Sequence, residues 1–485
     1  MNPTPSDSPA LAPASLLGRT YRHLTAAWRS SFLGSSPSIV PEGIPELRGN
    51  PLLGSLSAFR SDLIGLFQAT SALGPLSRFR MFRIPIHVVT DTDLAHEILI
   101  EKRGSFKKTR ELSTYLQPLL GSGLLAAEGE VHQRNRKLLA PAFAARRVID
   151  YGKVMVEETI EQLGRWTPDQ QVDLSEEMTK LTLAIVGRAL FGRAMHEEAE
   201  QIVSAYTLAM RAMMKRITSL VQAPYAFPLP SHRKMRRAVE MIDIVVQRII
   251  DHRRAEGGDH GDVLSMLLLA RDETDGTGLT DKAVRDEVIT LLAGHEATAS
   301  ALTWTWYELG RNPEVRAKLT AEIDAVLGTR PVTVADLPRL PYNLAVIEEA
   351  LRLHPPVYAL GREACEDVEL GGHRFGARST IFLNMYGIYR RADYYPDPLA
   401  FKPEHMAPER KKARPHYAYL PFGDGPRVCI GAHFAMLELQ LLLATMVQRG
   451  TVEVEPGERT TDPLMTLRLR GPLPATVGPR RASAS

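Results

Sequence analysis

The chain has 485 residues, of which 44% are hydrophobic and 24% are charged, and its formal net charge is +3. This composition is typical of a globular protein with a large core, and so small a charge gives no reason to expect nucleic acid binding. The sequence contains only two cysteines, Cys365 and Cys429, which excludes a disulfide framework and favours a reducing, cytoplasmic location.

The first 36 residues differ in composition from the rest of the chain. Residues 1–15 are rich in Pro, Ser and Ala, and a basic amphipathic stretch comes after them. Its apolar residues at helical spacing are Leu17, Tyr21, Leu24, Trp28 and Phe32. Such a stretch can dock on the protein body, lie on a membrane surface or act as a targeting peptide, and we favour docking. No apolar run approaches the ~20 residues of a membrane-spanning helix. We therefore predict a flexible, amphipathic leader over residues 1–36, one folded domain over residues 37–485 and no transmembrane segment.

Short strands and an irregular segment are predicted before the main helices. Residues 77–90 predict two strands, and the pattern turns helical after Thr92. Residues 109–126, which contain Gly121 and Gly123, predict a flexible loop without regular structure.

A basic segment and a long helical region come next. His132 and Arg136 are four residues apart, so they share one face of a predicted helix. The usual interpretation of such a run is a solvated basic face. From Tyr151 to Arg254 the sequence is mostly helical, with a proline-rich break at residues 223–230 that separates two helices.

Residues 281–310 predict one helix of about 30 residues, which would be about 45 Å long. The segment is apolar nearly all round, which predicts burial on several sides. A glycine at position 294, in its middle, costs about 1 kcal/mol in helix propensity, so another requirement must offset that cost. Glu296 and Thr298 add polar groups where unpaired burial is unfavourable.

Glu349 and Arg352 are three residues apart on a predicted helix and can form an ion pair. An exposed pair would contribute only about 0–1 kcal/mol. The apolar neighbours Val346 and Leu353 instead predict that the pair is buried. Further along, residues 368–375 predict a hairpin with a Gly-Gly turn.

Cys429 lies in a loop just before a helical pattern over residues 432–449. Three glycines in this loop permit close backbone approach, Phe422 offers an aromatic wall, and Arg427 lies two residues before the sulfur, within reach of an anionic group. The positive end of the following helix favours a thiolate. A free cysteine is more often a small buried hydrophobe, but the coincidence of these features favours a metal-ligating thiolate.

The segment Phe422–Gly431 resembles the haem loop of the cytochrome P450 family, because it matches the family's pattern F-G-x-G-x-R-x-C-x-G at every fixed position. Glu349 and Arg352 match the family's E-x-x-R motif, and the resemblance extends from about residue 40 to residue 478. It implies the cytochrome P450 fold, which is triangular, mainly α-helical with small β-sheets, and consists of a single catalytic haem domain. It also implies that Cys429 is the proximal thiolate ligand of the iron of haem b.

The resemblance assigns further residues to the haem group. His132 and Arg136 match a helix motif that holds one propionate, and Arg362 stands where the family binds the second propionate. His405 replaces the arginine that usually completes the E-x-x-R network and can still donate a hydrogen bond. The implied haem-binding residues are His132, Arg136, Arg362, Phe422, Arg427 and Cys429.

The oxygen-binding helix of the family carries the pattern A-G-x-D/E-T, and this chain departs from it. Ala293, Gly294 and Glu296 match, but Ala297 stands where the family usually has threonine, and Thr298 comes next. That threonine hydroxyl helps to deliver protons during oxygen activation. With alanine at position 297, three alternatives remain. Water or Thr298 delivers the protons, a hydroxyl group of the substrate delivers them, or the enzyme does not follow the ordinary oxygenation cycle. Glu296, Ala297 and Thr298 are therefore the candidate catalytic positions.

The resemblance implies a monomeric monooxygenase that hydroxylates or epoxidises an apolar small molecule with one oxygen atom of O₂, with secondary metabolism as one setting. No redox domain follows the haem segment, so we expect a separate donor of the ferredoxin or flavodoxin type with its reductase. A predicted basic loop over residues 410–414, with Arg134 and Lys137, can steer an acidic donor. The alternatives are a haem-thiolate isomerase or dehydratase, a peroxide-using enzyme, and a non-catalytic haem sensor.

Overall fold

The computed structural model describes residues 37–193, 195–219, 227, 229–271 and 278–480. The predicted leader over residues 1–36 and most of the proline-rich break at residues 223–230 lie outside the described residues.

Helices make up most of the described chain, which confirms the prediction of a mainly α-helical protein with small sheets. The longer helices are α6 (Gly129–Leu139), α7 (Ala145–Gly164), α8 (Leu174–Phe191), α9 (Ala199–Ile217), α10 (Pro230–Glu256), α12 (Asp281–Leu292), α13 (His295–Arg311), α14 (Pro313–Leu327), α15 (Pro341–Leu353) and α18 (Ala432–Arg449). The shorter helices are α2 (Leu56–Ser61), α3 (Leu63–Ser71), α4 (Thr92–His96), α5 (Gln117–Leu120), α11 (Val263–Leu269), α16 (Met385–Ile388) and α17 (Pro408–Ala413).

The largest sheet has six strands in the order β1-β2-β3-β9-β6-β4. Its strands are β1 (Glu46–Leu47), β2 (Leu76–Met81), β3 (Ile84–Val89), β4 (Phe106–Lys108), β6 (Leu360–Ala364) and β9 (Thr380–Leu383). The antiparallel pair β2–β3 is the pair of strands predicted over residues 77–90. This sheet brings β4 and β6, which are about 250 residues apart in the sequence, into register.

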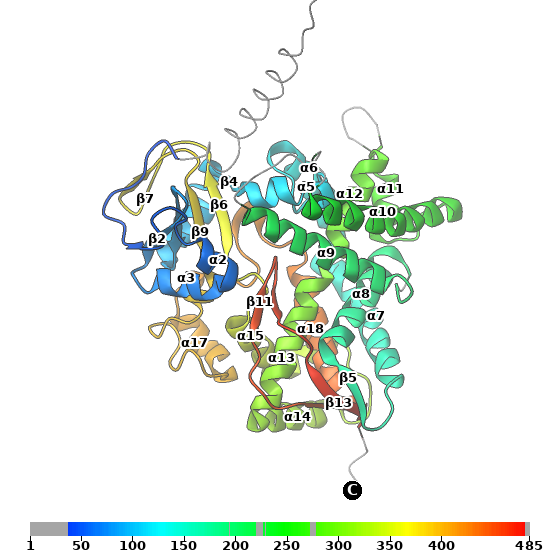
Figure 1. Ribbon diagram of the computed structural model, residues 1–485. Coiled ribbons are helices and arrows are strands. Elements are labelled where there is room, and N and C mark those ends of the chain that lie inside the picture. The colour runs from blue at the N-terminus through cyan, green and yellow to red at the C-terminus, as the bar shows by residue number, and fades with distance from the viewer. Residues whose placement is uncertain (1–36, 194, 220–226, 228, 272–277, 481–485) are drawn as a thin grey trace, which may run out of the picture.

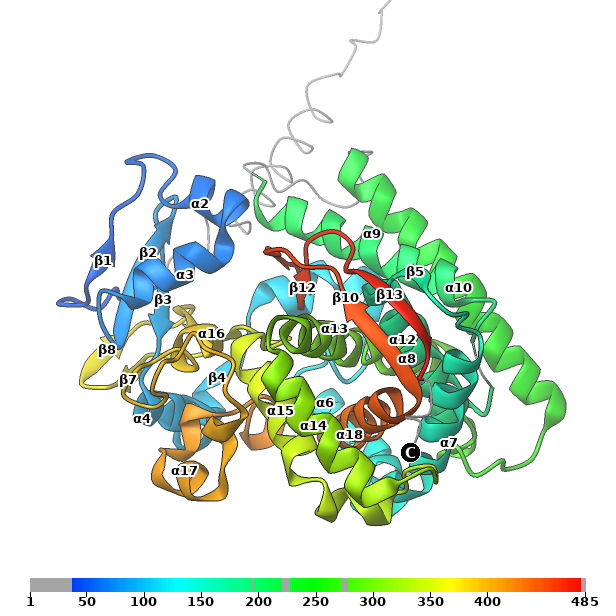
Figure 2. The ribbon, with the colours of Figure 1, turned by 90° about the horizontal axis from the view of Figure 1, so that it is seen from below.

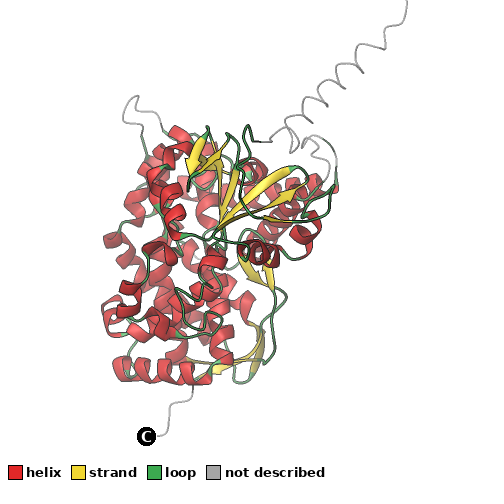
Figure 3. Cartoon of the chain, turned by 90° about the vertical axis from the view of Figure 1, so that its left-hand side faces the viewer, coloured by secondary structure: helices red, strands yellow, loops and turns green. Residues whose placement is uncertain are grey.

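Three smaller sheets complete the β-structure of the described residues. One has the order β10-β13-β5, and the other two are the hairpins β11-β12 and β7-β8. Their strands are β5 (Gln170–Asp173), β7 (Val368–Leu370), β8 (His373–Phe375), β10 (Gly450–Val454), β11 (Thr461–Pro463), β12 (Leu467–Leu469) and β13 (Pro474–Pro479). The β7-β8 turn is the predicted Gly-Gly turn, with φ values of +57° at Gly371 and +75° at Gly372. Strands β2, β4, β6, β7 and β9 lie on one side of the molecule, whereas β5, β11 and β13 lie among the long helices that form the rest (Figures 1 and 3).

Helix α13 lies near the middle of the helical part, with α8, α15, α18 and β12 packed around it (Figure 2). Trp304 and Trp306 on this helix are 1% and 2% exposed. The predicted burial of this segment on several sides is therefore confirmed.

The prediction of one unbroken helix over residues 281–310 is wrong at one point. Helix α12 ends at Leu292 and α13 begins at His295. The His295 ring nitrogen Nδ1 bonds to the Leu292 carbonyl, the acceptor that the Glu296 N–H would use in a regular helix. The Glu296 N–H instead reaches the Ala293 carbonyl at 3.4 Å. A side chain inserted into the hydrogen-bond ladder thus breaks the helix, a recognised cause of such irregularities.

The prediction of a flexible loop over residues 109–126 is also wrong. The segment contains a π-helical turn at Glu111–Tyr115 and helix α5, and two buried carboxylates of α12 hold the residues after α5. Asp286 accepts the Ser122 N–H at 2.8 Å, and Glu287 accepts the Leu124 N–H at 3.1 Å. The sequence did not show these anchors because they lie more than 160 residues away.

Gly121→Ala is expected to lower the free energy of unfolding by about 1–3 kcal/mol more than Gly129→Ala does. Both glycines have left-handed backbones, with φ values of +55° and +54°. A Cβ at Gly121 would lie 2.0 Å from Asp286 Oδ2, whereas a Cβ at Gly129 meets nothing within 4 Å. Asp286 cannot move freely because it also pairs with Lys282. Denaturant unfolding measures both variants, and equal losses would contradict the anchored loop.

Candidate active site

The loop before α18 presents Cys429 at the N-terminal end of that helix. The Cys429 N–H donates to the Phe422 carbonyl at 2.9 Å, and the Val428 N–H donates to the Gly425 carbonyl at 3.0 Å. Gly425 has φ +72°, and a Cβ there would lie 2.4 Å from the Leu99 carbonyl oxygen. Glycine is therefore required at this position, as the sequence predicted for a close backbone approach.

The Cys429 side chain is accessible to solvent although protein surrounds it on most sides. Burial raises the pKa of its thiol, and the Gly431 N–H and the charge of Arg136 only partly offset this. The helix terminus therefore does not by itself produce a free thiolate at neutral pH. A metal cation bonded to the sulfur would do so, because coordination deprotonates a thiol.

Strands β4 and β6, helix α6 and the cysteine loop itself bring basic side chains together. The β4–β6 register places Lys108 opposite Arg362. Arg427 donates to the Ala127 carbonyl at 2.8 Å. The other members of the cluster are His132 and Arg136 on α6, and Arg136 donates to the Val428 carbonyl.

Burial and mutual repulsion depress the pKa values of three of these basic groups. Burial, Arg427 and Arg362 lower the pKa of Lys108 to about 7 against the opposing pull of Glu128. Burial and the three neighbouring cations lower the pKa of His132 to about 4. Burial and Arg427 lower the pKa of Arg362 to about 10. Glu128, which is ion-paired with Arg427, opposes the shifts of Lys108 and Arg362, whereas no carboxylate among the described residues opposes the shift of His132. A buried cluster with excess positive charge fits a group that carries two carboxylates, as haem does.

The sequence did not identify Lys108 as a member of this basic cluster. Its Nζ donates to the carbonyls of Leu125 at 2.6 Å, Ala127 at 3.1 Å and Leu124 at 3.3 Å. The adjacent Lys107 has a side chain that is 45% exposed, whereas Lys108 is 9% exposed. Only the register of β4 decides which of the two lysines points inward, so the residue types alone carried no signal.

Three consecutive residues on α13 have different surroundings. Ala297 is half-buried, and so is Ala293 one turn earlier, while Gly294 is exposed, so the small residues form an open face on a mostly buried helix. Glu296 is buried and bonds to β12 through Arg468. Thr298 is buried as well and contacts α18.

The Thr298 hydroxyl lies beside the Glu438 carboxyl of α18. Burial raises the pKa of Glu438 to about 8, although the Thr298 hydroxyl lowers it. At neutral pH Glu438 is therefore mostly a neutral acid. The structure thus places the Thr298 hydroxyl in a buried contact with α18 and leaves Ala297 on the open face.

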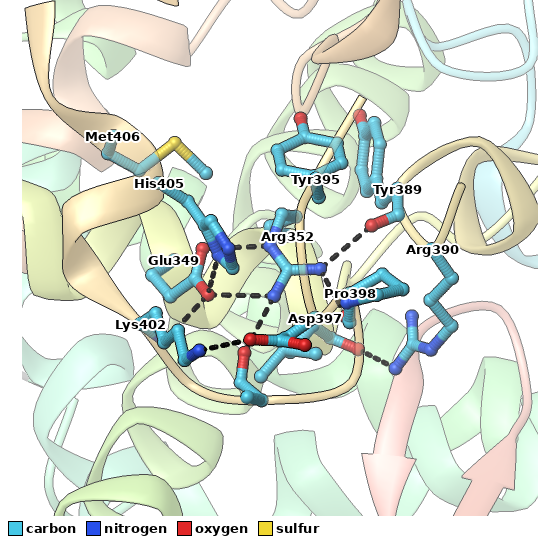
Figure 4. A network of polar contacts seen from close by, with 12 residues as sticks. Glu349, Arg352, Tyr389, Arg390, Tyr395, Asp397, Pro398, Lys402, His405 and Met406 are labelled. Carbon is cyan, nitrogen blue, oxygen red and sulfur yellow. Dashed lines mark hydrogen bonds and ion pairs between the residues drawn. The ribbon is translucent and has the colours of Figure 1, made fainter. Parts of the chain in front are cut away.

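Glu349 and Arg352 form a buried pair, as predicted from their apolar neighbours, and both side chains are 0% exposed. Arg352 donates to Glu349 at 2.7 and 2.8 Å (Figure 4). His405 bonds to Glu349 Oε1 through Nδ1 at 2.8 Å and to the Pro396 carbonyl through Nε2 at 2.6 Å. Both partners of the imidazole are acceptors, so His405 serves this network as a hydrogen-bond donor, as the sequence predicted.

Among the described residues, no helix is both long enough and apolar enough to cross a bilayer. Residues 44–477 match the family model described as Cytochrome P450. The cyclooctatin synthase of Streptomyces melanosporofaciens is 34% identical over 447 residues, which cover 92% of this chain and 94% of that protein. The cyclooctat-9-en-7-ol 5-monooxygenase of the same organism is 33% identical over 437 residues, with 89% and 94% covered. The pentalenene oxygenase of Streptomyces avermitilis is 31% identical over 408 residues, with 84% and 90% covered.

Proposed function

Because the chain belongs to the cytochrome P450 family and is a haem-dependent monooxygenase, we propose that its substrate is a cyclic terpene hydrocarbon or a hydroxylated derivative of one. The names of two relatives carry this proposal. One is a pentalenene oxygenase and one is a cyclooctat-9-en-7-ol 5-monooxygenase. These names specify oxygen insertion into an alkene and an unsaturated alcohol.

The substrate proposal can be tested with pentalenene as the probe and lauric acid as the comparison. We expect pentalenene to shift the Soret band of the purified holoenzyme toward the high-spin position at lower concentration than lauric acid does. With NAD(P)H, a ferredoxin and its reductase, we expect an oxygenated product. Tighter binding and turnover of the fatty acid would overturn the terpene assignment.

Haem b, when bound, supplies the chemistry that activates O₂ and transfers one oxygen atom to the substrate. Cys429 would ligate the iron, and Phe422 would form a wall beside it. These basic side chains would pair with the two propionates, which relieves the repulsion that helps to depress the pKa values of His132 and Arg362. The residues that would pair with the propionates are His132, Arg136, Arg362 and Arg427.

The open face of α13 and the β11-β12 hairpin are suited to an apolar substrate. Leu464 and Met465 form the tip of the hairpin. The Tyr358 hydroxyl donates to the Leu464 carbonyl at 2.8 Å, and the Leu467 N–H donates to the Pro356 carbonyl at 2.9 Å. The tip is therefore held in place, and its side chains exclude water from the substrate.

The electron donor is a separate protein in this proposal, of the ferredoxin or flavodoxin type. Residues 408–413 are helix α17, so the predicted basic loop is wrong; Pro408 suits the first turn of a helix. Lys411 pairs with Glu348, and Arg414 donates to the His405 carbonyl at 2.8 Å. Of the cations predicted for this face, Arg134, Lys137, Arg410 and Lys412 are exposed. Electron transfer that does not slow with added salt would contradict this docking face.

Two further assignments complete the proposal. Residues 37–485 form a single haem domain that acts as a monomer, which size-exclusion chromatography of the holoenzyme tests. A cytoplasmic location agrees with the two free cysteines at positions 365 and 429.

Ala297→Thr is expected to change the rate of product formation by no more than about tenfold, or about 1.4 kcal/mol in barrier height. Ala297 is half-buried on the open face of α13, so water has access to the place where a threonine hydroxyl would lie. The added hydroxyl would provide a second route for proton delivery, in addition to the one that water or a substrate hydroxyl already provides. Ala299→Thr is the matched control at a position that is 3% exposed, where we expect loss of haem content. A rate gain well beyond tenfold in Ala297→Thr would mean that the wild-type chain lacks a working proton path.

Glu296→Ala is expected to lower the product formed per NAD(P)H about threefold to tenfold. A positioned acid or base that acts alone accelerates a proton-transfer step by at least about 10²-fold. The effect expected here is smaller because water beside Ala297 shares the proton path. The measurement compares NAD(P)H consumed, peroxide released and product formed in the two proteins. Glu308→Ala removes another carboxylate from the same helix, which pairs with His354, and should leave the coupling ratio unchanged. Equal coupling in Glu296→Ala and wild type would remove Glu296 from the proton path.

A further inference from the structure

A buried polar cluster joins the acid of α13 to two elements that are distant in the sequence. Glu296 Oε1 accepts hydrogen bonds from the Thr466 hydroxyl and from Arg468 Nε, the latter at 2.7 Å. Arg468 also donates from Nη1 to the Thr207 hydroxyl at 3.1 Å. Thr466 and Arg468 belong to the β11-β12 hairpin, and Thr207 lies on α9. One guanidinium therefore links α13, the hairpin and α9.

The charge of Glu296 depends on this guanidinium. Burial alone would raise the pKa of the Glu296 carboxyl, but the bond and charge of Arg468, the Thr466 hydroxyl and the charge of His295 hold it below its usual value. From α9, Tyr206 also faces the acid, and burial together with Glu296 raises the pKa of its hydroxyl. Arg468 thus supplies the largest of the effects that keep Glu296 ionised.

The two bonds to Glu296 end on the same oxygen. Across the described residues, the structure assigns no protein donor to Oε2, so one oxygen of the carboxylate is fixed and the other can accept a proton. The carboxylate is therefore held in place through Oε1, while Oε2 stays open to a proton.

The hairpin that carries Arg468 is bound tightly to α13. The Ser300 hydroxyl and the Trp304 Nε1–H both donate to the Leu467 carbonyl, at 2.8 and 2.9 Å. Arg468 therefore moves with α13, whereas its bond to Thr207 reaches across to a different helix. A shift of α9 relative to α13 has to stretch that bond.

We propose that Arg468 is a positioning residue that holds Glu296 as a carboxylate next to Ala297 and fastens α9 to α13 through Thr207. The proposal rests on the monooxygenase function, in which Glu296 takes part in proton transfer. Neither task requires Arg468 to touch the substrate or haem.

The first test follows the protonation of Glu296 by infrared difference spectroscopy of the holoenzyme during a pH titration. In Arg468→Gln the cation is gone, so the pKa of the buried carboxyl rises. We expect a protonated carboxyl band at neutral pH that disappears as the pH becomes alkaline. The band should be absent from wild type in this range and from the double variant Glu296→Gln/Arg468→Gln at every pH. Glu287 and Glu438 have pKa values that burial raises to about 7 and about 8, and their bands cancel in the difference between variants.

Arg470→Gln is the matched control, because it makes the same change at an exposed arginine two residues further on. It should reproduce the wild-type titration. Arg468→Lys, which keeps a cation, should restore most of the ionised state. If Arg468→Gln leaves Glu296 ionised at neutral pH, the proposed control of charge is overturned.

The second test separates the link to α9 from the control of charge. Thr207→Val removes the hydroxyl, and we expect amide hydrogen exchange in α9 to become about tenfold faster, as for the loss of one bond from a charged donor. The infrared titration of this variant should match wild type, and Thr207→Ser should restore the slow exchange. Unchanged exchange in both Thr207→Val and Arg468→Gln would overturn the link to α9. The same samples, reduced under carbon monoxide, report separately on the haem–thiolate bond, so failure of the proposed function is recognised independently.

Discussion

Glu349→Ala is expected to yield protein that contains no haem and that is less stable by about 3–5 kcal/mol, the loss typical of one partner removed from a buried ion pair. Arg352 would remain buried without its carboxylate, and it would keep only the carbonyls of Tyr389, Pro398 and Ala400 as acceptors. The Lys402 N–H, which donates to Glu349 at 2.9 Å, would also lose its acceptor.

The effect reaches the haem loop through a short chain of contacts. The Tyr389 hydroxyl accepts the Leu420 N–H at 2.9 Å, two residues before Phe422. Disorder in the segment held by Arg352 would therefore release the start of the cysteine loop. This is why we expect lost haem binding in addition to lower stability.

The control for this variant is Glu453→Ala, which breaks an ion pair between Glu453 and the Arg316 side chain at 2.7 Å. The Glu453 side chain is 67% exposed, so the change should cost at most about 1 kcal/mol and leave haem content normal. The ratio of Soret to protein absorbance, with denaturant unfolding, measures both variants. Normal haem content in Glu349→Ala would refute the role given to the buried network.

Cys429→Ala is expected to abolish product formation, whereas Cys365→Ala is expected to leave it unchanged. The chain offers these two cysteines only, and the structure leaves both as free thiols. Cys429 lies at the start of α18 with its N–H bonded to the Phe422 carbonyl, whereas Cys365 is exposed beside the carboxylates of Glu363 and Glu366. Only the first is placed to bind a metal.

The measurement for this pair is product formation at equal protein concentration, together with the absorption spectrum of each holoenzyme. Haem bound in Cys429→Ala without the sulfur would keep an altered Soret band but support no turnover. Equal activity of the two variants would show that the sulfur at position 429 is not the ligand.

Local motifs made much of this site predictable. The loop around Cys429 and the Glu349–Arg352 pair each lie within ten consecutive residues. The structure contains both the loop and the ion pair that their residue spacing predicts. Hydrophobic periodicity likewise located the buried helix around Trp304. Such features depend on neighbours in the chain, which a sequence displays directly.

The remaining features depend on contacts between distant segments. Lys108 faces the cation cluster because β4 pairs with β6, and Glu296 is ionised because Arg468 reaches it from 172 residues further along. The break between α12 and α13 depends on one rotamer of His295. Neither strand register nor a rotamer can be deduced from residue types, so these features appeared only in the structure.

The central claim is that the sulfur of Cys429 donates to haem iron, and carbon monoxide tests it most directly. The purified, haem-loaded protein is reduced, exposed to carbon monoxide and scanned in the visible range. We predict the strongly red-shifted Soret band of a thiolate-ligated carbonyl complex, present in wild type and Cys365→Ala and absent from Cys429→Ala. A carbonyl band at the unshifted position in undenatured wild-type protein would contradict the account.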